Sequence, residues 1–200
     1  MKSTLLNLGG GDAPIAGAIN IDISPGDHID KIVDLCQMPW PWNNDEIDGI
    51  YMIHCLEHFP DRIAIFKECW RILKPGGFLY AQVPHASSLY ALTDLGHYTA
   101  FSMNTFYQLE GAGYFKDCLF QTEFLRIFWL FQAHNKKHPY VPFELDDSTV
   151  CHPKWRRYFG FFSHMIQFLI DANPVLFERI WHGWVGGADE IVWKGIKITP

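Results

Sequence analysis

Short apolar runs separated by turn residues fill the first 84 residues of this 200-residue chain. Five of them have the length and composition of strands, and they cover residues 4–8, 18–23, 29–35, 47–53 and 78–83. Apolar runs of about four to eight residues bounded by glycine, proline or aspartate are typical of buried strands. Because these strands alternate with turns and at least one helix, the sequence predicts an α/β fold with a doubly wound, mostly parallel sheet.

One helix is indicated between the fourth and fifth runs. Asp61 is a good N-cap residue, and an apolar face follows it at spacings of three and four residues, formed by Ile63, Phe66, Trp70 and Leu73. The Lys-Pro-Gly-Gly sequence at residues 74–77 ends this helix. Between Gly11 and Ala18, by contrast, there are too few residues for a crossover helix, so a clipped turn is expected to join the first two strands.

The pattern changes after residue 85. A short helix at residues 102–110, a strand at 115–126 and a last strand at 190–198 are expected. The intervening stretch is rich in aromatic residues and is broken by prolines, and we expect it to form a helical insertion, a lid or a homodimer interface. The predicted division is a core of residues 1–127, an aromatic insertion of residues 128–187, and residues 188–200, which return a final strand to the core sheet.

Composition and charge narrow the class of protein. Charged residues make up 19% and hydrophobic residues 48%, which excludes a disordered chain. A formal charge of -6 argues against a nucleic-acid partner, because phosphate-backbone binding needs clustered basic residues. The five cysteines are odd in number and form no Cys-x-x-Cys pair, which favours a reducing, cytoplasmic location over a disulfide framework. No run is long enough for a transmembrane segment.

A glycine loop and two strand-end acids together suggest a ligand crevice. Gly9 and Gly11 allow backbone amides to approach a ligand closely. Asp22 suits the two hydroxyls of a ribose, and Asp34 with Leu35 suits an adenine, although each acid alone is also explained as a solvated turn residue. Asp22 follows Gly9 by 13 positions, whereas a dinucleotide fingerprint wants about 20. The carboxyl ends of parallel strands bring these groups to one crevice.

The order of these motifs resembles a known family. The matching segments are Leu6-Asn7-Leu8-Gly9-Gly10-Gly11-Asp12, Asn20-Ile21-Asp22, Val33-Asp34-Leu35, residues 47–54, Leu56-Glu57-His58-Phe59, Arg71-Ile72-Leu73-Lys74-Pro75-Gly76-Gly77, residues 97–102 and residues 112–115. Together they resemble class I S-adenosylmethionine-dependent methyltransferases, most closely the type 11 group, over about residues 4–127. The resemblance implies a seven-stranded Rossmann-like methyltransferase fold, S-adenosylmethionine as cofactor and S-adenosylhomocysteine as product.

The resemblance also implies roles for individual residues. The expected cofactor-binding residues are Leu8, Gly9, Gly10, Gly11, Asp22, Ile23, Asp34, Leu35 and His54. The glycine loop would pass beneath the methionine portion of the cofactor, and His54 would lie near both the methionine and the substrate. The chain departs from the family pattern at two positions: Asn7 stands where an acid is frequent, and Ala13 replaces a frequent glycine.

Histidines are the candidates for proton transfer. The resemblance implies a small-molecule or glycan acceptor and in-line methyl transfer, and we expect O-methylation. A hydroxyl acceptor needs a base within about 3 Å, and His97, His85 and His54 are the catalytic candidates in that order. Each of them, taken singly, is also explained as a surface or capping histidine. No metal is expected in this interpretation.

Two other classes of function stay open. His54-Cys55-Leu56-Glu57-His58 is a literal H-x-x-E-H, the inverted zincin spacing, and on a helix it would place both histidines on one face for a zinc hydrolase. This interpretation needs an α-helix through the motif and a third ligand. Alternatively, the chain is a non-catalytic protein that binds S-adenosylmethionine or serves in assembly.

Overall fold

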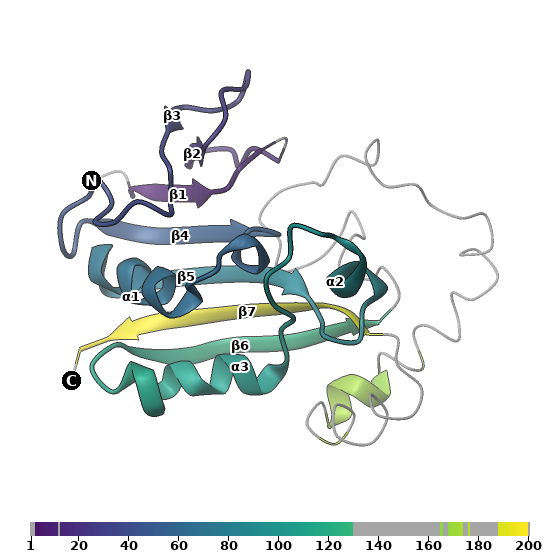
Figure 1. Ribbon diagram of the computed structural model, residues 1–200. Coiled ribbons are helices and arrows are strands. Elements are labelled where there is room, and N and C mark those ends of the chain that lie inside the picture. The colour runs from purple at the N-terminus through teal and green to yellow at the C-terminus, as the bar shows by residue number, and fades with distance from the viewer. Residues whose placement is uncertain are drawn as a thin grey trace.

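A seven-stranded sheet organises the part of the chain that the computed structural model describes, which is residues 3–11, 13–129, 165, 168–173, 176 and 188–199 (Figure 1). The spatial order of the strands is β3-β2-β1-β4-β5-β7-β6. Their bounds are β1 (Leu5–Leu8), β2 (Ile19–Asp22), β3 (Lys31–Ile32), β4 (Ile47–Ile53), β5 (Leu73–Pro84), β6 (Leu119–Trp129) and β7 (Ala188–Ile198). The predicted fold class and the seven-stranded sheet are confirmed.

The strand directions place several strand ends at one edge of the sheet. β1 pairs in parallel with β2 and β4, with Asn7 opposite Asn20 on one side and Tyr51 on the other, and β5 is parallel to β4. β7 runs antiparallel between β5 and β6, with Glu190 opposite Pro84. The beginning of β7 therefore lies at the same edge of the sheet as the carboxyl ends of the parallel strands.

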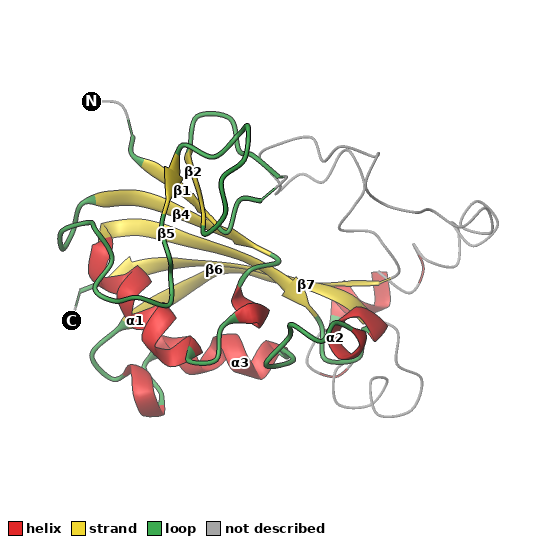
Figure 2. Cartoon of the chain, turned by 45° about the horizontal axis from the view of Figure 1, so that its top comes forward, coloured by secondary structure: helices red, strands yellow, loops and turns green. Residues whose placement is uncertain are grey.

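Three α-helices lie on one face of the sheet (Figure 2). They are α1 (Arg62–Ile72), α2 (Leu89–Thr93) and α3 (Met103–Tyr107), and short 3-10 helices lie at Leu56–His58, Gln108–Glu110 and Gly113–Phe115. Residues 168–172 are also helical. The Asp61 side chain caps α1 by accepting a hydrogen bond from the Ala64 amide at 3.0 Å, as the sequence predicted. The main core fills the space between these helices and the sheet, and the fully buried Trp193 of β7 stacks on Phe106.

The other face of the sheet carries a smaller buried cluster. Tyr51, Tyr80 and Val192 of three neighbouring strands meet Ile15, which comes from the β1–β2 connection. None of the described residues of that connection is helical, which agrees with the short turn predicted between the first two strands. The connection instead folds against the sheet edge and covers part of this face.

Several element boundaries differ from the sequence expectation. β5 starts directly at Leu73, because the sequence 74–77 forms an irregularity in the β4–β5 pairing rather than a separate turn. The helix expected at 102–110 is split into α3 and a 3-10 helix that ends at Gly111, whose φ is 98°. β6 continues to Trp129, past the predicted end of the core at residue 127. The rest of the predicted insertion, with its aromatic dimer interface, lies mostly outside the described residues.

Within the described residues, no helix has the length and apolar character needed to cross a membrane.

Candidate functional site

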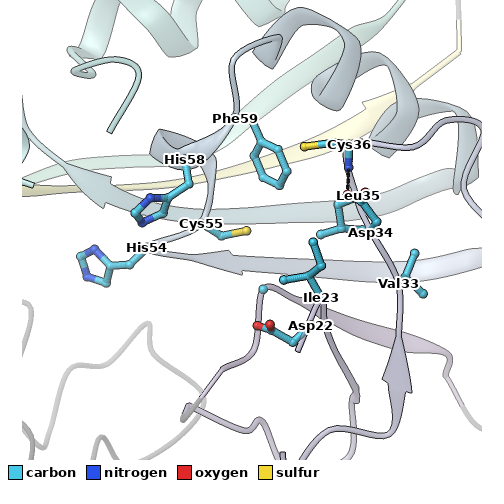
Figure 3. A pocket seen from close by; sticks show the side chains of 11 residues that line it. Asp22, Ile23, Val33, Asp34, Leu35, Cys36, His54, Cys55, His58 and Phe59 are labelled. Atoms are coloured by element: carbon cyan, nitrogen blue, oxygen red, sulfur yellow. Dashed lines mark hydrogen bonds between the residues drawn. The ribbon is translucent and has the colours of Figure 1, made fainter. Parts of the chain in front are cut away.

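The carboxyl ends of β1, β2 and β4 border a cavity of about 310 Å³ (Figure 3). Its lining consists of Gly9, Asp22, Ile23, Val33, Asp34, Leu35, Cys36, His54, Cys55, His58 and Phe59. Six of these residues are among the nine expected to bind the cofactor. The volume falls within the range of roughly 300–1,000 Å³ that is typical of small-molecule sites.

The glycine loop brings the main chain against β4. Gly9 has a φ of 69°, and a Cβ at this position would collide with the side chain of Cys55. A side chain is therefore disfavoured twice, by the left-handed backbone conformation and by the lack of space. The Gly10 amide donates a hydrogen bond to the Ile21 carbonyl at 2.9 Å, which ties the loop to β2.

Asp22 ends β2 with its carboxylate held by two main-chain donors. The Gly11 amide donates to Oδ2 at 3.0 Å, and the Ser24 amide donates to Oδ1 at 3.0 Å. Each carboxylate oxygen can accept a further hydrogen bond. The side chain is thus oriented in advance while it keeps acceptor capacity for two hydroxyl groups of a ligand.

The other end of the cavity combines a polar edge with apolar surface. Asp34 accepts a hydrogen bond from the Cys36 amide through Oδ1 at 2.9 Å. Val33, Leu35 and Phe59 supply apolar side chains to the same lining. Figure 3 shows Asp34 and Cys36 at the opposite end of the cavity from the histidines. A flat heterocycle with polar edges, such as adenine, fits these contacts.

The lining therefore fits the adenosyl cofactor that the sequence predicted. Gly9 brings the main chain into the lining, Asp22 presents two acceptor atoms, and Leu35 with Phe59 offers apolar faces. Burial raises the pKa of the Cys55 thiol, with further contributions from nearby carboxylates, so this side chain lines the cavity as a neutral group.

His54 follows β4 at the opposite end of the cavity. Its φ is 48°, a conformation that is uncommon for a residue with a side chain and that is typical of functional sites. Nε2 lies 3.0 Å from Glu190 Oε1, and Nδ1 lies 3.4 Å from Glu57 Oε1. Desolvation lowers the pKa of His54, but its interactions with Glu190 and then Glu57 outweigh this effect and raise the pKa to about 10.

A second group of polar side chains stands beside His54. Glu57 and His58 lie on the 3-10 helix after β4, and His97 comes from the connection between α2 and α3. His97 Nε2 is 4.0 Å from Glu57 Oε1 and 3.7 Å from Asp94 Oδ2. The rings of His58 and His97 meet edge to face, with their centroids 4.7 Å apart. Of these residues, His58 lines the cavity.

The other predicted site residues lie outside the cavity lining. Leu8 is fully buried in the core, and Gly10 and Gly11 hold the loop through the main-chain hydrogen bonds described above. His85 is also fully buried, and its Nδ1 lies 2.8 Å from Ser87 Oγ. The lining thus unites one catalytic candidate, His54, with the predicted cofactor residues, while His97 stands behind His58.

The H-x-x-E-H segment does not adopt the inverted zincin arrangement. His54 follows a strand, whereas Glu57 and His58 lie on a three-residue 3-10 helix, so the two histidines do not share a helix face. The α-helix that the zinc interpretation requires is therefore not formed, because β4 continues to Ile53, where the sequence analysis ended the fourth strand. The segment did nevertheless indicate Glu57 and His58, which the resemblance alone did not assign.

Comparisons with known proteins agree with this geometry. Residues 19–81 match the family model of the methyltransferase domain. A methyltransferase-like protein from Bacillus halodurans is 17% identical, with a TM-score of 0.57 and coverage of 100% of this chain and 94% of that chain. An S-adenosylmethionine-dependent methyltransferase from Archaeoglobus fulgidus is 17% identical, with a TM-score of 0.54 and coverage of 98% and 86%. No curated protein matches the chain.

A third solved structure adds a ligand-bound case. Phosphoethanolamine N-methyltransferase 2 from Haemonchus contortus, in complex with S-adenosylmethionine, is 11% identical, with a TM-score of 0.52. The alignment covers 100% of this chain and 50% of that chain. At such identities the structures establish the fold. The match of residues 19–81 to the methyltransferase domain agrees with the resemblance to class I S-adenosylmethionine-dependent methyltransferases.

Proposed function

We propose that this methyltransferase transfers the methyl group to a hydroxyl oxygen of a small molecule or glycan. The observation that carries this proposal is the group of histidine and glutamate side chains at the end of the cavity away from Asp34. His54 and His58 line that end (Figure 3). Glu57 Oε1 lies 3.4 Å from His54 Nδ1, and the His97 ring meets the His58 ring edge to face. An oxygen nucleophile loses a proton during the transfer, so it benefits from such groups.

The binding roles follow from the cavity. Asp22 would hold the ribose hydroxyls, Asp34 and Leu35 would hold the adenine, and the main chain at Gly9 would support the methionine portion. The cofactor supplies an activated methyl group: the oxygen lone pair forms the new bond to carbon, the carbon–sulfur pair returns to sulfur, and the hydroxyl proton is lost. The protein mainly has to align the acceptor and exclude alternative partners.

The Glu57–His97 pair is the proposed activating group. A carboxylate beside an imidazole stabilises the charge that develops when a proton is taken up. His54 already lies between two carboxylates, so we assign it the role of orienting Glu57 at the cavity end. His85 is fully buried and engages Ser87, which leaves it the weakest of the three histidine candidates.

The acceptor class rests on size and charge. A cavity of about 310 Å³ accommodates little beyond the cofactor, so the acceptor would enter as a small molecule or as the end of a glycan. The formal charge of -6 disfavours a polyanionic acceptor. A nitrogen acceptor is the main competitor, because one protein of similar fold is an N-methyltransferase.

The cofactor part of the proposal is tested by binding. We expect Asp22→Ala to weaken S-adenosylhomocysteine binding in calorimetry by about 1.5–3 kcal/mol, or roughly 10- to 150-fold, because charge-assisted hydrogen bonds to the ribose are lost. Asp27→Ala is the matched control, since Asp27 is an exposed acid on the neighbouring loop that does not line the cavity. An unchanged affinity in Asp22→Ala would remove Asp22 from the site.

The acceptor part is tested by product chemistry. The purified protein is incubated with methyl-labelled S-adenosylmethionine and a panel of sugars, alcohols and amines, and the products are identified by mass spectrometry. The proposal expects label in alkali-stable methyl ethers. Label in methylamines would overturn the assignment to oxygen. Tight product binding without label in any acceptor would favour a non-catalytic cofactor-binding protein.

A further inference from the structure

We propose that Glu57, His58 and His97 form a binding site for one divalent transition-metal cation of the zinc class, at the acceptor end of the cofactor cavity. The inference rests on the proposed function and specifies how the same site activates a hydroxyl group. The site differs from the H-x-x-E-H interpretation in its ligands, because His54 is replaced by His97 and Glu57 becomes a ligand rather than a base.

The three side chains already converge. One ligand atom from each of Glu57, His58 and His97 lies within 4.8 Å of the others. In a tetrahedral site with metal–ligand distances of about 2.0–2.2 Å, ligand atoms are separated by roughly 3.3–3.6 Å. The ligand atoms therefore have to approach one another by at most about 1.2–1.5 Å, which side-chain rotations can supply.

The backbone holds the two contributing segments together. The Tyr98 amide donates a hydrogen bond to the Glu57 carbonyl at 2.9 Å. The His58 ring also lies against this connection, with Nδ1 3.2 Å from the Gly96 carbonyl oxygen. These contacts fix the chain around His97 beside the 3-10 helix that carries Glu57, so the ligand set is largely preformed.

The hydrogen bonds of the two rings select the tautomer that binds metals. His58 Nδ1 faces the Gly96 carbonyl at 3.2 Å, and His97 Nδ1 faces the Ala91 carbonyl at 3.4 Å. A carbonyl oxygen only accepts hydrogen bonds, so each Nδ1 carries the hydrogen and Nε2 of the neutral ring keeps its lone pair. Histidine metal ligands usually donate one ring N–H to an acceptor such as a backbone carbonyl and bind the metal through the other ring nitrogen.

Glu57 supplies a buried carboxylate that keeps acceptor capacity beyond its interaction with His54. Its side chain is only 1% exposed, and neither carboxylate oxygen has a hydrogen-bond partner at ordinary distance among the described residues. The closest nitrogen atoms belong to His54 at 3.4 Å and His97 at 4.0 Å. Burial of a carboxylate is costly unless it is paired or bound to a metal. Asp94, 3.7 Å from His97, is within reach as an additional oxygen ligand.

Two neutral imidazoles and one carboxylate are a ligand set for zinc and related metals. Three protein ligands leave a coordination position open, and His58 places that position beside the cavity because it is exposed and part of the lining. An acceptor hydroxyl bound there would lose its proton to water more easily. The cation keeps its oxidation state, and the methyl transfer itself balances as described above.

The test measures metal binding directly. The purified protein is stripped with a chelator and titrated with Co²⁺, whose visible absorption reports nitrogen and oxygen coordination, and Zn²⁺ is then added as a competitor. We expect one equivalent of Co²⁺ to bind. His58→Ala, at an exposed position, and Glu57→Gln, which keeps the shape of the side chain, should each weaken binding by more than about 100-fold, since even outer hydrogen-bond partners are worth 10- to 100-fold.

Controls separate this result from other outcomes. His28→Ala removes an exposed histidine that does not line the cavity and should leave the titration unchanged. Circular dichroism of each variant shows whether it is folded. Absence of a one-equivalent site, or a site that survives in His58→Ala and Glu57→Gln, would overturn the proposal and leave Glu57 paired with His54 alone. S-adenosylhomocysteine calorimetry on the stripped protein tests the cofactor site separately, so failure of one inference is distinguished from failure of the other.

Discussion

A single methyl group added at Gly9 should disturb both the fold and the cofactor site. In Gly9→Ala the new Cβ has to adopt a φ of 69° and collides with the side chain of Cys55. The left-handed conformation costs a residue with a Cβ about 1–2 kcal/mol. Overpacking against a buried side chain typically costs about another 1–3 kcal/mol. We therefore expect the free energy of unfolding to fall by about 2–5 kcal/mol.

Gly17 provides a control that isolates the backbone effect. Its φ is 84°, but a Cβ there would meet no atom within 4 Å. Gly17→Ala should therefore lose only the conformational part, about 1–2 kcal/mol. Adding Cys55→Ala to Gly9→Ala should recover part of the remaining loss, because it removes the sulfur atom that the new Cβ meets. The recovery is partial, since the Cβ of residue 55 also lies close, at 2.9 Å.

The assay is chemical denaturation followed by circular dichroism, with S-adenosylhomocysteine calorimetry on the same proteins. Gly9→Ala should bind the product more weakly than Gly17→Ala, because the displaced loop lines the cavity. Equal stability losses at the two glycines would refute the close approach of Gly9 to Cys55. Normal product affinity in a folded Gly9→Ala protein would refute the placement of the loop against the ligand.

Two further predictions concern polar groups outside the cavity. Asn7→Asp should destabilise the fold by about 1–3 kcal/mol in denaturation experiments, although the family often has an acid here, because Asn7 Nδ2 donates to the Ala13 carbonyl and to Asn20 Oδ1, and a carboxylate would face two acceptors. Hydrogen bonding to Arg71 lowers the pKa of Glu68 below its ordinary value of 4.5. This pair therefore stabilises the fold fully above pH 4.5, and its contribution is lost as the pH falls through the lowered pKa. Glu68→Gln should flatten this part of the curve of unfolding free energy against pH.

Local sequence rules were sufficient for the strand-end residues of the cavity. The positions of Gly9, Asp22 and Asp34 follow from strand periodicity and from the convergence of the carboxyl ends of parallel strands. The same rules predicted α1, whose cap at Asp61 is formed by the expected hydrogen bond. These features depend on contacts between near neighbours or adjacent strands, which a sequence pattern records directly.

Groups that meet across long stretches of chain could not be predicted in the same way. His97 reaches Glu57 because the connection after α2 folds back onto the 3-10 helix, where the Tyr98 amide bonds to the Glu57 carbonyl. No periodicity records that contact. The Lys-Pro-Gly-Gly sequence was predicted to lie between the helix and a strand that begins at residue 78, yet strand pairing with β4 incorporated it into β5 as an irregularity. In both cases tertiary pairing decided the local structure.

The last strand, β7, brings the carboxylate of Glu190 to the edge of the cavity, where the sequence analysis assigned no residue from this strand. Glu190 is 3% exposed, and its Oε2 accepts a hydrogen bond from Gln82 Nε2 at 2.8 Å, which fixes the carboxylate at the cavity edge. Its Oε1 lies 3.0 Å from His54 Nε2. Since His54 has an uncommon φ of 48°, this contact on one side and Glu57 on the other hold its ring in position. The antiparallel insertion of β7 between β5 and β6 therefore completes the histidine end of the cavity as well as the core. Residues 1–127 alone contain Gly9, Asp22 and Asp34 of the lining but lack Glu190, the second carboxylate beside His54.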